Sequence, residues 1–159
     1  MRILILAIGS LISLFSFASA SPTADARSAI LSEERQSNAA FCRGDVAGVL
    51  ADTTPDYVQI LSDGKAVNKV KSSQILQAFV PSTHVKHFSE HILSFHLLNS
   101  SEAVVTNSTH AIYSLVSKTS GAHVTLDENS IDRDYWVRTS DGWRKKRSRT
   151  LSDQTKIIR

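Results

Sequence analysis

The sequence lacks several residue patterns that would identify a specific chemistry. It has a single cysteine, Cys42, which excludes an internal disulfide, so an exported form would be stabilised by packing alone. Its 6 glycines form no G-x-G-x-x-G loop, and the nucleophile elbow G-x-S-x-G is absent too. These absences argue against a phosphate-cradling loop and against a serine hydrolase of the α/β type. Cys42 falls on the apolar side of an expected helix, so we predict a buried, inert thiol.

One apolar run is present, and it lies at the very start of the chain. Met1-Arg2 supplies a positive start, residues 3–18 are mostly apolar, and Ala18-Ser19-Ala20 fits the small-x-small cleavage pattern. The run is shorter than the about 20 residues of a membrane-spanning helix. We therefore predict a cleaved signal peptide over residues 1–20, a secreted or periplasmic location, and no stable membrane insertion afterwards.

Charge is nearly balanced overall and uneven along the chain. The formal net charge is +3, and loss of Arg2 would lower it to +2. Five basic side chains fall within residues 144–149, while the remainder is slightly acidic. Such a cluster can attract anions, or it can protect an exposed strand from pairing with another molecule. Export and the scarcity of interleaved aromatic residues argue against nucleic acid as a partner.

The order of elements predicts an α+β domain. Periodicity predicts helices over residues 29–42, 46–51 and 69–80, with Gly44 and Asp45 separating the first two. Strand patterns follow at residues 57–61, 91–98, 103–116, 131–139 and 143–151, with turns predicted at residues 99–101, 119–121 and 140–142. We predict a flexible segment at 21–28, one domain at 29–152 and a tail at 153–159.

Three motifs resemble the nuclear transport factor 2-like superfamily, with its small SnoaL-like domains as the nearest branch. They are residues 39–51, residues 56–65 with Asp63-Gly64, and residues 135–143 with Asp141-Gly142-Trp143. The resemblance implies a cone-shaped, strongly curved, mostly antiparallel sheet with about three helices on its concave side. It also implies a pocket, a homodimer formed through the sheet, and no cofactor.

The resemblance also allows isomerase chemistry to be checked. Aligned on Gly44-Asp45, the oxyanion-stabilising tyrosine of ketosteroid isomerases falls near Ser37, and the proton-abstracting aspartate falls near Leu61. Leucine cannot accept a proton, so we expect this chemistry to be absent. Asp134 aligns loosely with a second isomerase carboxylate.

Strand alternation selects the candidate pocket residues. An inward Leu61 would place Tyr57 and Gln59 on the same face, either as ligand contacts or as ordinary core and backbone partners. Asp132, Asp134, Trp136 and Arg138 also share one face. If that face points inward, Arg138 favours an anionic ligand; if it points outward, Asp134 and Arg138 form a solvent-side salt bridge.

The six histidines do not indicate a metal site. His87-x-x-Glu90-His91 has the spacing of a zinc peptidase motif, but the segment is expected to be extended, where residues four apart are too distant to share one ion. We expect no metal; His110 is a further candidate for the pocket.

Together these patterns predict an exported domain that binds a small hydrophobic or anionic molecule and has no evident catalytic apparatus. The candidate pocket residues are Tyr57, Gln59, Asp134, Trp136, Arg138 and His110. Two alternatives stay open: a cofactor-free lyase, isomerase or hydrolase using polar pocket residues such as Tyr57, Asp134 and His110, and a protein-interaction module.

Overall fold

The computed structural model describes residues 21–116 and 121–158. The predicted signal peptide and part of the predicted turn at residues 119–121 lie outside these ranges. None of the helices within them is long and apolar enough to cross a membrane.

Helix α1, Pro22–Arg43, begins earlier than the sequence pattern predicted. Ser21 caps it by accepting a hydrogen bond from the Ala24 amide, and Pro22 occupies the first turn, where no amide donor is needed. Ala26 is buried, so packing extends the helix through this segment. The prediction of a flexible segment at 21–28 is therefore wrong.

The other helices are short and begin at polar caps. Asp45 caps α2, Val46–Val49, and Asn68 caps α3, Lys69–Phe79, which continues into the 3-10 turn Val80–Ser82. Gly44 ends α1 with a φ of 77°, a conformation that favours glycine. The chain therefore turns sharply between α1 and α2, as the Gly44-Asp45 pair predicted.

The six strands form one sheet with the order β2-β1-β6-β5-β4-β3. Their bounds are β1 Thr53–Ile60, β2 Ala66–Asn68, β3 His84–Asn99, β4 Glu102–Val116, β5 His123–Thr139 and β6 Gly142–Ile158. All neighbours pair antiparallel except β1 and β6, which are parallel.

Several features of this sheet differ from the sequence prediction. Strands β1, β3 and β5 begin at Thr53, His84 and His123, earlier than the predicted starts at residues 57, 91 and 131. The short strand β2 was missed, because three residues carry no readable alternation. The predicted tail at 153–159 is also wrong through residue 158, since residues 152–158 pair with β5 as far as Thr125. Backbone pairing extends the hairpin there, although the side chains are exposed.

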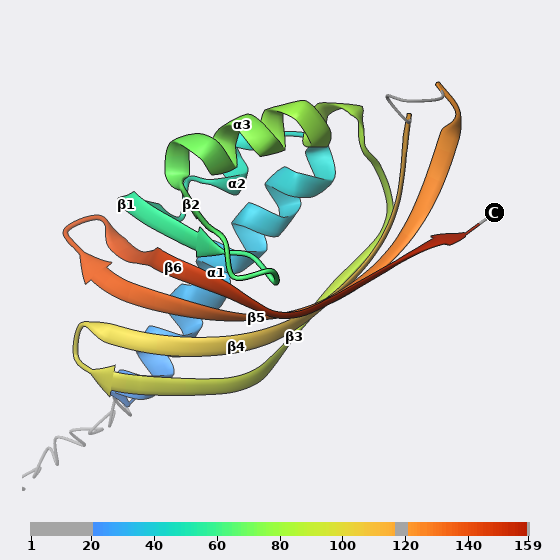
Figure 1. The fold of residues 1–159 in the computed structure, drawn as a ribbon. Coiled ribbons are helices and arrows are strands. Elements are labelled where there is room, and N and C mark those ends of the chain that lie inside the picture. Colours follow the sequence, from blue (N-terminus) through green and yellow to red (C-terminus); the bar gives the residue numbers. More distant parts are fainter. Residues whose placement is uncertain (1–20, 117–120, 159) are drawn as a thin grey trace, which may run out of the picture.

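The sheet is strongly curved, and the three helices lie on its concave side (Figure 1). Irregularities in register interrupt the β3–β4, β5–β6 and β1–β6 pairs, and such bulges increase local twist and bending. The predicted α+β cone is confirmed.

The apolar core lies under the N-terminal half of α1. Ala26 and Ile30 of the helix pack there with Trp136 and Trp143 of the β5–β6 hairpin, and Ala103 and Val105 of β4 complete the cluster. Further along β4, the inward residues Asn107 and Thr109 border a polar region, and beyond it Tyr113 belongs to a second apolar group with the rings of Phe41, Phe79 and Phe88.

Candidate functional site

The buried face of α1 changes character halfway along the helix. Ile30 and Glu34 are one turn apart, so they point the same way, and both are almost fully buried. Ser37 lies one turn further on, where its hydroxyl donates to the Val49 carbonyl at 2.9 Å. The N-terminal half of α1 therefore covers the apolar core, and the segment from Glu34 to Ser37 covers a polar region.

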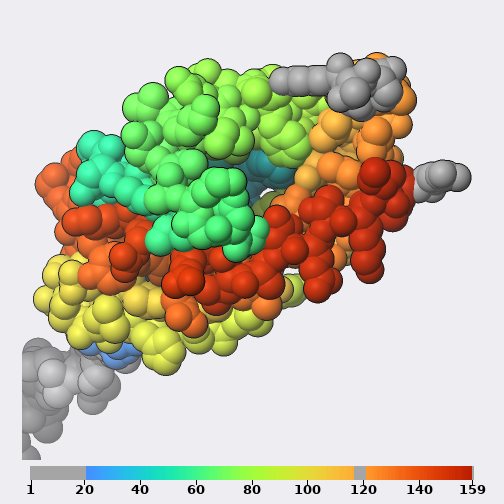
Figure 2. Space-filling model, in the orientation of Figure 1, coloured from blue at the N-terminus to red at the C-terminus, as the bar shows by residue number. Residues whose placement is uncertain are grey.

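That region contains a cavity of about 210 Å³. On the face shown in Figure 2, a hollow opens between α3 and β6. The wall comprises side chains from all three helices and from β1, β3, β4, β5 and β6, together with the segment before β1: Ser37, Val49, Leu50, Asp52, Thr53, Tyr57, Gln59, Ser72, Leu76, Glu90, Asn107, Thr109, Asp132, Asp134, Lys145 and Ser148.

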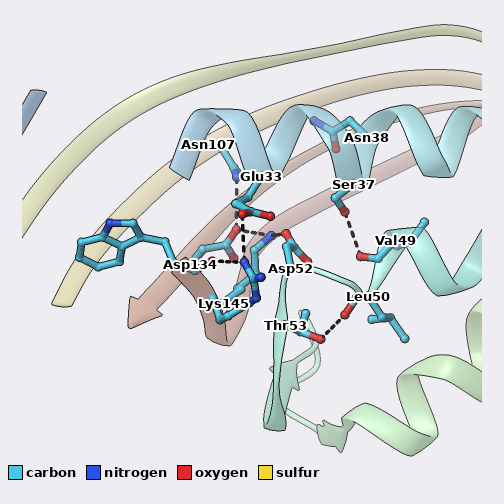
Figure 3. Close-up of polar contacts among 12 residues, drawn as sticks. Glu33, Ser37, Asn38, Val49, Leu50, Asp52, Thr53, Asn107, Asp134 and Lys145 are labelled. Carbon is cyan, nitrogen blue, oxygen red and sulfur yellow. Dashed lines mark hydrogen bonds and ion pairs between the residues drawn. The ribbon is translucent and has the colours of Figure 1, made fainter. Parts of the chain in front are cut away.

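Lys145 lies at the centre of the polar contacts (Figure 3). Its ammonium nitrogen is 3.0 Å from Asp134 Oδ2 and 3.7 Å from Asp52 Oδ2, and the two carboxylate side chains are 2% and 3% exposed. Asn107 donates to Asp134 Oδ2 at 3.4 Å. The Lys145 amide also donates to the Asp52 carbonyl at 2.7 Å, so backbone and side chain together fix Lys145 beside Asp52.

Two further carboxyl groups on the wall are bonded to neutral partners. Asn38 donates to Glu90 Oε2 at 2.7 Å. Asp132 accepts from Thr150 at 2.8 Å and from Ser130 at 2.9 Å. Four wall carboxyl groups therefore surround one lysine, and only two of them lie within ion-pair distance of it.

Burial controls the protonation of this cluster. It raises the pKa of Glu34 from 4.5 to about 8, with the Lys145 charge opposing the shift and neighbouring carboxylates adding to it. Burial likewise raises the pKa values of Asp52, Glu90 and Asp132. For Lys145, burial disfavours the ammonium form, but the carboxylates of Asp134 and Asp52 outweigh it and raise its pKa well above 10.5.

Three of the six predicted pocket residues line this cavity: Tyr57, Gln59 and Asp134. Tyr57 and Gln59 share one face of β1, as alternation predicted. Burial raises the pKa of Tyr57 to about 12, so its phenol stays protonated at neutral pH. The alternative of a solvent-side salt bridge between Asp134 and Arg138 is wrong, because Asp134 is buried against Lys145.

The other three candidates lie elsewhere. Trp136 is fully buried in the apolar core under α1. Arg138 is exposed and borders a separate cavity of about 420 Å³ near the start of α1. His110 contacts Asp127 at 3.0 Å, and its neighbours Thr109 and Ala111 face the helix side, so His110 lies on the opposite face of β4. None of the three contributes to the wall.

The basic cluster at residues 144–149 is divided between the two faces of β6. In the register with β5, Tyr135 faces Arg147 and Trp136 faces Lys145, so Lys146 is an extra residue in a β-bulge. Lys145 and Ser148 therefore both point into the cavity, which strict alternation does not allow. The strand-protection alternative is wrong for this segment, because β6 lies between β1 and β5.

Sequence reasoning missed Glu34, Asp52 and Lys145. The spacing of Ala26, Ile30 and Glu34, four residues apart each time, could have placed Glu34 on the buried face of α1. No comparable signal exists for Lys145, whose orientation depends on the bulge. Cys42 is exposed, so the prediction of a buried thiol is wrong; it lies away from the buried face of α1.

Metal binding is not indicated by the described part of the chain. Across residues 21–116 and 121–158, no group of three or more histidine, cysteine, aspartate or glutamate side chains is placed to hold an ion. His87 and Glu90 are part of the extended strand β3, as expected.

Comparison with known proteins indicates a fold and no specific activity. No family model matches the chain, and no curated protein does. Among solved structures, a hexachlorocyclohexane dehydrochlorinase (type 2) is similar with a TM-score of 0.69 at 8% identity, covering 87% of this chain and 92% of that one. A putative scytalone dehydratase from Novosphingobium aromaticivorans has a TM-score of 0.67 at 13% identity, covering 87% and 91%.

A third similar structure has no activity in its description. It is a nuclear transport factor 2-like protein from Cytophaga hutchinsonii, with a TM-score of 0.65 at 15% identity, covering 79% of this chain and 97% of that one. These identities are too low to transfer an activity, since one fold hosts many chemistries. The chain therefore has the nuclear transport factor 2-like fold, as the resemblance predicted.

Proposed function

We propose that this domain binds a small polar molecule in the cavity under α1. The observation that carries the proposal is a cavity whose wall combines buried hydrogen-bonding groups with an apolar side formed by Val49, Leu50 and Leu76. Ligand sites typically combine an apolar lining with a few converging polar groups that orient the ligand.

The wall chemistry changes the expected ligand class. An anionic ligand was predicted on the condition that Arg138 faced the pocket, and Arg138 lies elsewhere. An anion would instead meet four wall carboxyl groups, and a purely hydrophobic molecule would leave them without partners. The arrangement favours a ligand that donates hydrogen bonds.

A thermal-shift screen of the protein against small carboxylates, sugars, amines and aromatic rings tests this function. A ligand that binds only the native state stabilises it by about 2.7 kcal/mol at one hundred times its Kd. We expect at least one class of compounds to raise the Tm by several degrees.

Two variants on the same strand make the test specific. Thr109→Phe fills the cavity and should abolish the shift, because Thr109 lines the wall. Thr106→Phe, with Thr106 also on β4 but on its other face, should retain it. Equal shifts in both variants would show that the compounds bind outside the cavity.

A second candidate is a cofactor-free lyase, isomerase or hydrolase. It is favoured by the raised pKa values of Asp52, Glu90 and Asp132, since groups perturbed by burial concentrate at active sites. Proton NMR of any bound compound incubated with the protein in D2O would test it. Deuterium incorporation at carbon or a new product, absent with Thr109→Phe, would favour the enzyme.

The third alternative, a protein-interaction module, is less favoured. It requires a filled interior with Gln59 and Trp136 on the outside, whereas Gln59 borders the cavity and Trp136 is buried. Export and homodimer formation stay predictions; the size of the secreted product and sedimentation analysis would test them.

A further inference from the structure

Several buried polar atoms on the cavity wall have no hydrogen-bond partner. They are both carboxylate oxygens of Asp52, Oδ1 of Asp134 and the hydroxyl of Ser72. All three residues line the cavity and are at most 3% exposed. Buried polar atoms are rarely left unpaired in folded proteins, so each one needs an explanation. A bound ligand with several N–H donors would supply the missing partners.

The charge balance of the wall points to the kind of donor. Lys145 is the one cation among the described lining residues, and its ammonium lies between Asp134 and Asp52. Glu90 and Asp132 are hydrogen-bonded only to neutral groups. Glu34 lies buried next to the cluster, and neither of its oxygens has a hydrogen-bond partner. Acidic groups therefore outnumber the cations that could neutralise them.

We propose that the ligand carries a cationic nitrogen, an ammonium or amidinium group, that binds the Oδ1 atoms of Asp52 and Asp134, which Lys145 does not contact. This inference rests on the proposed function and specifies its ligand class. Each N–H of such a group donates to a carboxylate oxygen, and charge-assisted hydrogen bonds of this type are the stronger kind. Tyr57 and the apolar wall are placed to contact the uncharged part of the ligand.

The size of the cavity limits the ligand. About 210 Å³ is below the roughly 300–1,000 Å³ of pockets that hold drug-sized molecules. A compact amine with one ring, or a short diamine, is the expected scale.

Binding of a cation should be coupled to proton release. The groups that face the site are Glu34 from α1, Asp52 before β1, Tyr57, Glu90, Asp132, Asp134 and Lys145. Burial raises the pKa of Glu34 to about 8, so this carboxyl group is mostly protonated at neutral pH, and burial also raises the pKa values of Asp52, Glu90 and Asp132. A bound cation lowers these pKa values and displaces protons. Affinity should therefore increase as the pH rises towards 8.

Calorimetric titration of the protein with matched probes tests this inference. Cyclohexylamine, cyclohexanol and cyclohexanecarboxylate share one ring and differ in charge, and benzylamine with benzyl alcohol provides a second pair. We expect at least one amine to bind tenfold or more tightly than its neutral partner at pH 8, and at least fivefold more weakly at pH 6. Titrations in phosphate and in HEPES, neither of which is a primary amine, should give different apparent heats, because released protons are taken up by the buffer.

Variants of the wall carboxyl groups separate the site from general charge effects. Asp52→Asn should weaken amine binding at least tenfold, while Asp56→Asn, which removes an exposed carboxylate, should leave it unchanged. Glu90→Gln retains the neighbouring Asn38 and provides a second variant in case Asp52→Asn fails to fold; a severalfold loss is expected.

The outcomes distinguish this inference from the proposed function. If cyclohexanol or benzyl alcohol binds as tightly as its amine partner, and Thr109→Phe abolishes that binding, the cation inference is wrong and the proposed function stands. Preferential binding of the carboxylate would likewise overturn the inference. If no probe of any charge binds, and the thermal-shift screen is also negative, the proposed function itself fails.

Discussion

The two faces of the β5–β6 hairpin carry opposite charges in very different surroundings. Asp132 and Asp134 point into the cavity, where burial raises the pKa of Asp132 and places Asp134 against Lys145. The intervening Arg133 is exposed on the outer face, directly opposite Arg149 on β6. Neighbouring residues in the sequence therefore experience environments that differ chiefly in their access to water.

This difference shows that burial, more than the number of charges, sets the energetic importance of each group. Arg133 and Arg149 have the same charge and no ion pair within the described residues, yet water screens their repulsion. Inside, burial raises the pKa values of Glu34, Asp52, Glu90 and Asp132 around one lysine. We therefore expect the same type of substitution to change stability strongly on the inner face and weakly on the outer face.

The largest effect is expected for Lys145→Met. The substitution leaves the buried carboxylates of Asp134 and Asp52 without their cation, and breaking a buried ion pair in this way costs about 3–5 kcal/mol. Urea unfolding at pH 7 would measure the loss. The matched outer-face change, Arg149→Met, should alter stability by less than about 0.5 kcal/mol. Similar losses in both variants would remove the proposed contrast between the faces.

Glu34→Gln should change the dependence of stability on pH. The Glu34 pKa is raised from 4.5 to about 8, so the native state holds its proton more tightly, and stability is lost as the pH rises from about 4.5 to 8. Above pH 8, the total loss in the free energy of unfolding approaches about 5 kcal/mol. Glu34→Gln removes this loss but buries an unpartnered amide, which costs about 1–3 kcal/mol. We therefore expect the variant to be more stable than the unsubstituted protein by about 2 kcal/mol at pH 9.

Unfolding of both proteins in urea between pH 5 and pH 9 checks this prediction. The gain should disappear at pH 5, where Glu34 of the native protein is protonated. Glu33→Gln is the neighbouring control: it removes a partly exposed ion pair with Arg144 and should cost less than about 1 kcal/mol at every pH. If Glu34→Gln changed the free energy of unfolding by the same amount at every pH, the raised pKa assigned to Glu34 would be contradicted.

The smallest effect is expected for Arg149→Glu. It converts a like-charged cross-strand pair with Arg133 into an opposite pair, which should stabilise the protein by about 0.2–1 kcal/mol. Unfolding in urea at low salt measures the gain, and added salt should remove most of it. Arg149→Gln should give a smaller gain. A destabilisation by Arg149→Glu would indicate that the outer face already has an anionic partner.

Local chemistry made much of the fold predictable. Gly44 and Asp45 mark the boundary between α1 and α2 through their backbone and capping preferences, and Asp141-Gly142 marks the β5–β6 turn. Alternation on β1 also placed Tyr57 and Gln59 on one face. Each of these signals is contained within a few residues, so it can be interpreted without knowing what packs nearby.

The remaining parts of the site depend on distant neighbours. Trp136 and Asp134 share a face of β5, but only the position of α1 decides that one enters the core and the other the cavity. Glu34 looks like a solvent-facing residue within a charged stretch until β5 and β6 are placed beneath the helix. Lys145 turns inward because the extra residue Lys146 interrupts the alternation.

The sequence alone determined the order of the helices and of five of the six strands, and with them the α+β class, since capping, periodicity and turn formation act over short stretches of chain; the curvature of the sheet was implied by the family resemblance. Only the tertiary structure decided which charged groups leave water. Desolvation depends on what covers a side chain, and the residues that cover Asp134 and Lys145 come from segments far apart along the chain.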